Sequence, residues 1–297
     1  MPISARFRVT LTLICVLLAL GGASASAQSP ADVRSQLKLA DSAHLQILTL
    51  RDGSTLVGRI TAIGQDTLTV ESSVGQLSVP LASVRRVQEV GSDRMKNGEY
   101  WFPNPNATRL FFAPSGRMLE KGEGYVSDYE VFFPGAAVGV TDNVSIGGGV
   151  SLFPAGLDEQ IYYFTPKIGA ALQENVNVAL GALIIGGIAD ESTVGIVYGV
   201  GTLGTPDASV TAGLGYGFAG TTMSRTPVAM LGGELRVSRR VGLVTENYII
   251  PDTGANPIFS YGVRLMGEKM TVDLALFNAS GSGSAIGLPF VDFVFRF

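Results

Sequence analysis

The stretch Val291-Asp-Phe-Val-Phe-Arg-Phe297 alternates strictly between two kinds of side chain and ends the sequence. Successive side chains of a β-strand point to opposite faces, so its three rings lie on one face and its two charges on the other. The rings are Phe293, Phe295 and Phe297, and the charges are Asp292 and Arg296. We therefore expect a strand between an apolar and a polar surrounding, either in a membrane or in a soluble sandwich.

An export signal stands at the other end of the sequence. Arg6 and Arg8 precede a largely apolar run over residues 11–20, and small residues including Ala25-Ser-Ala27 follow it. This order is typical of a secretory signal peptide, and the run is shorter than the roughly 20 residues that a spanning helix needs. We expect residues 1–27 to be a signal peptide that is cleaved after Ala27.

The composition of the remaining chain argues against several classes of protein. Its one cysteine, Cys15, leaves with the signal peptide, so neither a disulfide nor a thiolate metal site is expected. Loss of Arg6 and Arg8 takes the formal net charge from −4 to −6, whereas nucleic-acid binding needs clustered Lys and Arg. Charged residues make up 15% of the chain and glycine contributes 38 residues, which agrees with a membrane barrel.

Residues 192–224 resemble membrane helices in hydropathy, because Asp207 is their only charged residue. They contain eight glycines and Pro206, however. Each interior glycine costs a helix about 1 kcal/mol and a proline about 3 kcal/mol, so strands are favoured. The glycines at 199, 201 and 204 and at 215, 217 and 220 spell the dinucleotide-binding pattern, but that pattern needs a following helix, so we expect strand glycines that face a lumen.

A small β module precedes the glycine-rich region. After a polar lead at 28–43, which could form a short helix, residues 44–90 contain about five short strands joined by Gly and Asp turns. The motif Asp52-Gly53 followed by Gly58-Arg-Ile60 resembles small SH3-like or Sm-like barrels of envelope proteins. This resemblance implies a spacer or a module that binds another envelope protein.

A linker at 91–106 follows, and it contains the aromatic stretch Tyr100-Trp101-Phe102. Amphipathic rings favour the headgroup zone of a membrane, so the stretch could anchor the start of a barrel there. It could equally pack against the small module. The sequence leaves both roles open.

Residues 107–297 predict an antiparallel transmembrane β-barrel of about twelve strands. Most predicted segments have the 9–11 residues that a tilted membrane strand needs. The predicted strands are 108–114, 123–140, 144–153, 161–172, 176–186, 193–204, 208–218, 227–237, 241–250, 257–267, 270–278 and 286–297. Short connections at 141–143, 173–175, 205–207, 238–240 and 268–269 alternate with longer ones near 115–122, 154–160, 187–192, 219–226, 251–256 and 279–285.

This asymmetry is typical of barrels with tight periplasmic turns and longer external loops. The aromatic C-terminal stretch resembles the closing strand of bacterial outer-membrane β-barrels. The resemblance implies that Phe293, Phe295 and Phe297 form the signal read by the barrel assembly machinery, with outer-membrane lipid around the barrel. With an even strand count, the first and the last residue of the barrel lie on the same side of the membrane. We expect this side to be the periplasm, and hence the small module to lie there.

Charged residues of the predicted strands are expected to face inward, because a charge on the lipid face costs a few kcal/mol near the midplane. Pairing Gly267 with Met270 across the turn also sets Arg264 opposite Asp273. The charges could neutralise a closed lumen, form a polar path for a small solute, or pack against an inserted loop. The candidate lumen charges are Lys167, Glu234, Arg236, Glu246, Arg264, Asp273, Asp292 and Arg296.

Catalysis finds little support in the sequence. The one histidine, His44, lies at the start of the small module, and residues 108–297 contain none to activate a serine. No Asp-rich calcium loop or other metal-ligand spacing is present, so we expect no catalytic site, metal or cofactor. The sequence instead predicts a passive channel or small-solute transporter in the outer membrane. A closed barrel that anchors an interaction module, and a soluble secreted β protein, are the alternatives.

Deletion of Phe297 should impair barrel assembly, because the expected assembly signal ends on that ring. The measurement is the amount of folded protein at the outer membrane, read from the heat-sensitive gel shift of a folded barrel. Unchanged amounts of folded protein would count against the membrane interpretation.

Overall fold

The computed structural model describes residues 37–39, 44–96, 99–154, 160–187, 193–250, 257–279 and 287–297. The chain divides into two compact units, residues 1–101 and residues 102–297. The predicted signal peptide lies outside the described residues, as does the lead at 28–43 except for residues 37–39. Among the described residues, no helix combines the length and the apolar character needed to cross a membrane.

The first unit contains a five-stranded antiparallel sheet in the order β4-β3-β2-β1-β5. Its strands occur where the turn residues predict them. Their bounds are β1 His44–Leu50, β2 Thr55–Ile63, β3 Thr67–Ser72, β4 Gly75–Pro80 and β5 Val84–Gly91. Short 3₁₀ turns at Leu81–Ser83 and Ser92–Arg94 flank β5, and a hairpin of β6 (Met95–Lys96) and β7 (Glu99–Tyr100) ends the unit.

An apolar cluster and one tight turn hold this sheet together. Leu48, Ile60 and Leu68 are at most 1% exposed and form its centre. In the β1–β2 turn, Gly53 has φ +88°, a left-handed conformation that favours glycine. The Asp52 carboxylate there accepts hydrogen bonds from the Ser54 hydroxyl and amide, which lower the pKa of Asp52. His44, in β1, lies 3.9 Å from the Glu89 carboxylate.

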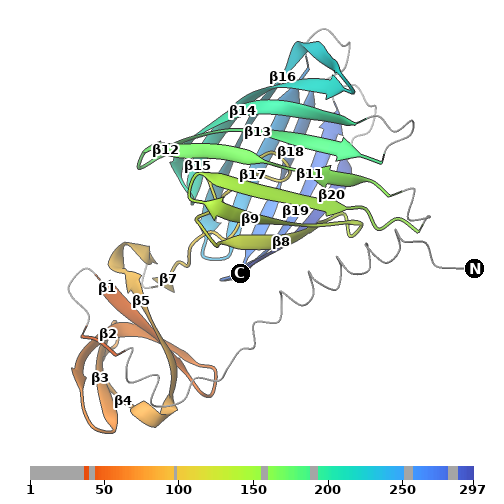
Figure 1. Ribbon diagram of the computed structural model, residues 1–297. Coiled ribbons are helices and arrows are strands. Elements are labelled where there is room, and N and C mark those ends of the chain that lie inside the picture. The colour runs from red at the N-terminus through yellow and green to blue at the C-terminus, as the bar shows by residue number, and fades with distance from the viewer. Residues whose placement is uncertain are drawn as a thin grey trace, which may run out of the picture. The chain divides into compact units, whose positions relative to one another are not determined.

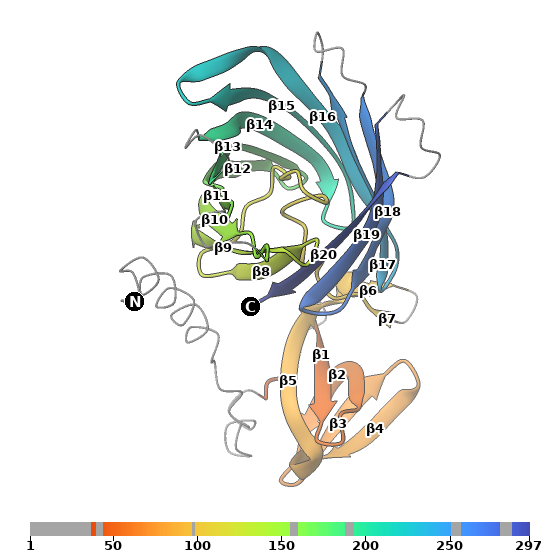
Figure 2. The same cartoon turned by 90° about the vertical axis from the view of Figure 1, so that its right-hand side faces the viewer.

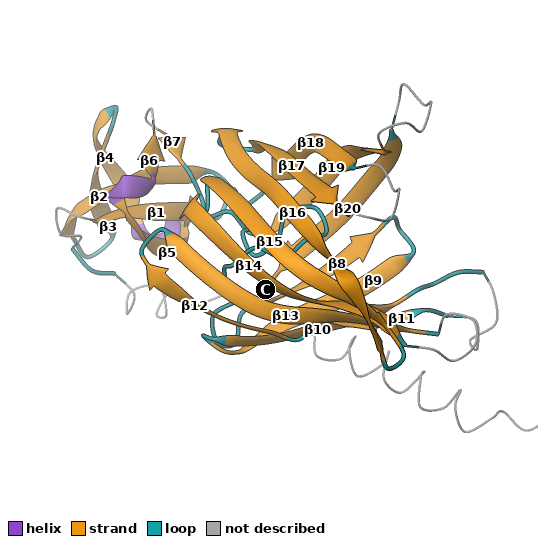
Figure 3. Ribbon diagram, turned by 90° about the horizontal axis from the view of Figure 1, so that it is seen from above, coloured by secondary structure: helices purple, strands orange, loops and turns teal. Residues whose placement is uncertain are grey.

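The second unit is a closed antiparallel barrel of twelve strands (Figures 1 and 3). β11 (Tyr162–Phe164) and β12 (Lys167–Gln173) both pair with β10 and β13, so they are two pieces of one strand. Pairing of β20 with β8 closes the ring and leaves no exposed sheet edge. The other bounds are β8 Gly124–Tyr129, β9 Phe133–Thr141, β10 Val144–Val150, β13 Val176–Gly186, β14 Val194–Thr205, β15 Ala208–Ala219, β16 Thr222–Ser238, β17 Val241–Ile249, β18 Ile258–Met266, β19 Met270–Ala279 and β20 Leu288–Arg296.

The strand count agrees with the prediction, but two of the predicted strands are wrong. Residues 108–114 form no barrel strand, and the single strand predicted at 123–140 is the hairpin of β8 and β9. Its turn contains Glu130 and Val131 at φ +55° and +67°. Neither residue is a usual turn former, so alternation continues through the turn and hides it.

The tight turns lie at one end of the barrel, where the chain also enters β8 and leaves β20. They are the five short connections that the sequence predicts, from 141–143 to 268–269. The opposite end has the long connections at 151–161, 187–193, 250–257 and 280–287 and two short ones at 130–132 and 220–221. The predicted loop at 219–226 is therefore wrong, because β16 extends back to Thr222.

Side-chain burial alternates along β15, as in a strand with one inner and one outer face. Val210 and Leu214 are 57% and 60% exposed on the outer face, whereas Thr211 is fully buried on the inner face. The glycines differ from the prediction in β14. Gly199 and Gly201 share their phase with the exposed Leu203 and face outward, whereas Gly215 and Gly217 in β15 face inward.

Replacing Val131 by glycine should stabilise the barrel by about 1 kcal/mol, because a β-branched residue at positive φ is strained. Val131 is 58% exposed, so little burial is lost. The measurement is the urea midpoint of unfolding in lipid vesicles. Val131→Ala, which keeps a Cβ at this φ, should recover less stability, and a fall in the midpoint for Val131→Gly would contradict the strain.

Candidate functional site inside the barrel

Residues 102–119 lie inside the ring of strands, and we call them the inner segment (Figure 2). Their centre is fully enclosed, since Phe111 is 0% and Leu110 is 2% exposed. Phe111 meets the inward rings of Phe277 and Phe290, each at 5.9 Å between centroids. The stretch 108–114, predicted as a wall strand, is therefore enclosed by the wall.

Arg264 in β18 joins the wall to the inner segment. Its Nε and Nη2 donate to the Asp273 carboxylate at 2.8 and 2.7 Å, and the β18–β19 register confirms the predicted pairing of these residues. Nη1 donates to Glu234 at 2.8 Å and to the Asn106 carbonyl at 3.0 Å. Nη2 also donates to the Leu110 carbonyl at 2.6 Å. All five N–H donors of this fully buried guanidinium thus have acceptors.

A second arginine makes the reciprocal contact from the inner segment. Arg109 Nη2 donates to Asp292 of β20 at 2.6 Å, and its Nε donates to Asn106 at 3.1 Å. The guanidinium carbon lies 4.6 Å from the ring centroid of Tyr129 and 5.3 Å from that of Tyr125. Arg109 is 4% exposed and Asp292 is 0% exposed, so both charges are paired within the lumen.

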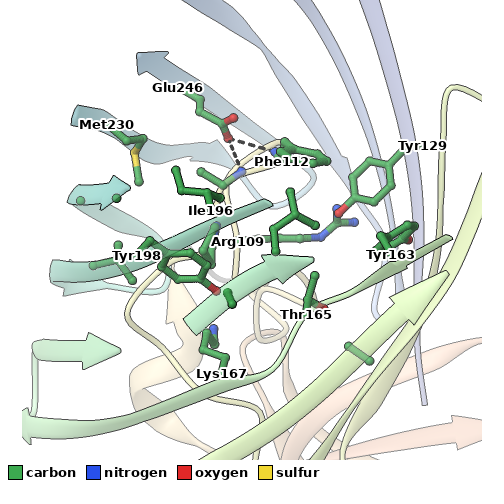
Figure 4. A pocket seen from close by; sticks show the side chains of 18 of the residues that line it. Arg109, Phe112, Tyr129, Tyr163, Thr165, Lys167, Ile196, Tyr198, Met230 and Glu246 are labelled. Carbon is green, nitrogen blue, oxygen red and sulfur yellow. Dashed lines mark hydrogen bonds between the residues drawn. The ribbon is translucent and has the colours of Figure 1, made fainter. Parts of the chain in front are cut away.

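Glu246 of β17 binds the backbone at the apex of the inner segment. Its Oε2 accepts from the amides of Phe112 and Ala113, each at 2.9 Å (Figure 4). Its Oε1 accepts from the Tyr248 hydroxyl at 2.6 Å. The carboxylate therefore satisfies two backbone donors of an irregular turn that no strand pairs.

Lys167 of β12 holds the same segment by its carbonyls. Its Nζ donates to the Arg117 carbonyl at 2.7 Å and to those of Ser115 and Thr108 at 3.3 and 3.4 Å. On the neighbouring wall, Thr202 Oγ1 accepts from the Gly116 amide at 2.8 Å. A Cβ at Gly116 would collide with the Asn177 carbonyl, so the close approach requires glycine.

Arg236 and Asn104 hold the segment near the tight-turn end. Arg236 Nη1 donates to the Phe102 carbonyl at 2.7 Å, and its guanidinium lies 4.7 Å from the Phe102 ring centroid. Asn104 donates to Glu234 at 2.7 Å. Phe102 is 3% exposed, so its ring does not take the headgroup position considered for the aromatic stretch. Trp101, in the first unit, lies under the Lys96 ammonium at 4.4 Å.

The predicted lumen charges thus fall into three groups. Six of them contact the inner segment. Its backbone is bound by Lys167, Arg236, Glu246 and Arg264. Its side chains Asn104 and Arg109 are bound by Glu234 and Asp292. Asp273 accepts hydrogen bonds from Arg264 and is the only one of the eight whose described contact to the segment is through another wall residue. Arg296 lies apart, paired with Glu123 at 2.5 Å and 27% exposed. The C-terminal rings of Phe293, Phe295 and Phe297 lie on the outer face and are 43–57% exposed.

Sequence reasoning missed Arg109, Asn104 and Asn106, because it placed them in a linker and a wall strand. One signal was available, since 102–119 lacks the alternation of its neighbours. Some inward glycines lie in close contact with an aromatic side chain. A Cβ at Gly135 or Gly149 would collide with the Tyr163 side chain, so these glycines accommodate a ring.

A cavity of about 750 Å³ remains between the inner segment and the wall. It lies towards the long-connection end. Figure 4 shows Tyr163, Ile196, Tyr198 and Met230 along it. Among the described residues, no group of three or more His, Cys, Asp or Glu side chains could hold a metal ion.

Replacing Arg264 by methionine should lower the free energy of unfolding by about 3–5 kcal/mol, because Asp273 and Glu234 would stay buried without their cation. Unfolding by urea in lipid vesicles measures this loss. Arg240→Met, in an exposed turn, is the matched control and should change stability by less than about 0.5 kcal/mol. Equal stability of the two variants would contradict the role given to Arg264.

Comparisons with known proteins give distant likenesses. No protein-family model and no curated protein matches the chain. A KdgM porin solved with disordered oligogalacturonate is 8% identical with a TM-score of 0.41, covering 59% of this chain and 95% of its own. A NanC porin is 11% identical with a TM-score of 0.40, covering 59% and 97%. A mutant Rh. blastica porin is 13% identical with a TM-score of 0.33, covering 86% and 97%. These values are too low to bear on function.

Proposed function

We propose that this protein is a bacterial outer-membrane barrel that lets a small solute cross the membrane, with the inner segment as its gate. The outer face supports the location. Leu180, Leu203 and Leu214 on β13–β15 are 60–64% exposed, and exposed apolar side chains on neighbouring strands fit contact with lipid. The tight turns would then face the periplasm. The residues where the chain enters and leaves the barrel would lie on the same side, together with the first unit.

The inner segment carries the proposal of a gate. Polar contacts from β12, β14, β16, β17, β18 and β20 hold it, and they close the tight-turn half of the lumen. Hydrogen bonds to charged groups contribute about 1.5–3 kcal/mol each, and water can replace them when the segment moves. Such polar contacts allow opening, although Leu110 and Phe111 of the inner segment also pack against apolar side chains of the wall.

A closed barrel that anchors the first unit is the second candidate. The complete pairing of Arg264 favours it, because a permanently closed lumen needs every buried charge satisfied. In that case, the sheet at residues 44–90 would bind another envelope protein. The barrel would contribute only attachment to the membrane.

Conductance of the folded protein in a planar bilayer separates the two candidates. The wild type should show rare openings, and the double variant Lys167→Met with Glu246→Gln should open at least about tenfold more often. Lys167→Met removes three hydrogen bonds to the inner segment, and Glu246→Gln removes the charge that strengthens the two from Phe112 and Ala113, while both changes keep side-chain size. We expect no change for Glu123→Gln, which breaks the Arg296 pair away from the inner segment.

A double variant that shows the gel shift of a folded barrel and stays silent would favour the anchor. Steady conductance in the wild type, unchanged in the double variant, would show that the inner segment is no gate.

A further inference from the structure

On β16 and β14 the inward side chains change from polar to apolar along the barrel axis, whereas β17 has Val244 nearer the tight turns than Glu246. On β16, starting from the tight-turn end, they are Arg236, Glu234, Gly232, Met230 and Val228. On β14 they are Thr202, Val200, Tyr198 and Ile196 in the same direction. The lumen therefore has a polar half, which the inner segment fills, and an apolar half towards the long connections.

The cavity occupies this apolar half. Its volume of about 750 Å³ is within the range of sites for small organic molecules. Leu183, Ile185 and Ile196 line both this cavity and a second hollow of about 560 Å³ at the ends of β13–β16. An apolar surface thus continues from the cavity to the rim. A path for ions or sugars would instead require polar groups along it.

The charged groups at the cavity are already engaged by the protein. The three N–H bonds of Lys167 face three carbonyls, Glu246 accepts three hydrogen bonds, and Arg109 is paired with Asp292. The Glu130 carboxylate, also in the lining, accepts from the Val291 amide at 3.1 Å. By contrast, the hydroxyls of Tyr163 and Tyr198 form no hydrogen bond within the described part of the chain. An anionic ligand would therefore lose its hydration without gaining a free cation here, whereas an uncharged ligand needs none.

We propose that the apolar half of the lumen binds an uncharged, largely apolar molecule that enters from the long-connection end. An aliphatic or aromatic body fits the lining of Ile196, Met230 and Phe277. A single hydroxyl or carbonyl of the ligand can meet Tyr163 or Tyr198. This inference names the class of solute for the proposed transport function. Passage of the molecule across the membrane rests on that function, whereas its binding requires only the folded barrel.

Saturable photolabelling tests the site in the full-length protein in lipid vesicles. The probe is decanol carrying a diazirine on its chain, and mass spectrometry maps the labelled residues. We expect saturable labelling at the inward Ile196, Tyr198 and Met230, and linear labelling of the outward Val197 and Leu231 from the lipid. Decanol should compete at concentrations at least about tenfold lower than decanoate, because the carboxylate finds no free cation.

Variants at Ile196 distinguish the cavity from the lipid. Ile196→Asn should raise the half-saturating probe concentration at least about tenfold, since its amide must be dehydrated, whereas Ile196→Leu should stay within about twofold. Met230→Gln replaces Ile196→Asn if that variant does not fold. Labelling of outward residues alone, or equal competition by decanoate, would overturn the inference. Gated conductance without saturable labelling would leave the proposed function standing, and labelling without passage would leave the site standing.

Discussion

The guanidinium of Arg264 is the point on which the interior of this barrel depends. A segment without regular structure must find partners for its amides and carbonyls once it is enclosed. Arg264 supplies two of them at Asn106 and Leu110, while Asp273 and Glu234 compensate its own charge. Glu246 likewise accepts from backbone amides at the apex, and Lys167 donates to backbone carbonyls further along the segment. The buried charges of the wall and the irregular backbone inside it therefore explain each other.

This exchange also accounts for the two halves of the lumen. Where the inner segment needs polar partners, the inward positions of β16–β19 carry Arg236, Glu234, Arg264 and Asp273. Beyond the apex there is no inner-segment backbone that requires polar partners, and the inward side chains are largely apolar and aromatic. At the apex, the rings of Phe111, Phe277 and Phe290 pack together at 5.3–5.9 Å between centroids.

Much of the wall could be predicted from the sequence, because strict alternation separates apolar outer side chains from polar inner ones. The pairing of Arg264 with Asp273 follows from a two-residue turn alone. The β8–β9 hairpin could not be found, because Glu130 and Val131 carry no turn signature. The inner segment escaped for another reason. Its partners lie as far as 183 residues away in the chain, as Arg109 and Asp292 do, and a local pattern does not report such contacts.

The inner segment begins and ends at the same end of the barrel. Phe102 lies by Arg236 and Arg239, next to the β16–β17 turn. Just after the inner segment, the Gly122 amide donates to the Gly139 carbonyl, next to the β9–β10 turn. Its apex at Phe111 and Phe112 reaches the rings of Phe277 and Tyr129. The insertion is thus a folded-back loop and not a thread through the ring. In the proposed gating motion it would leave the lumen as a loop, so no chain end would have to pass through the ring of strands.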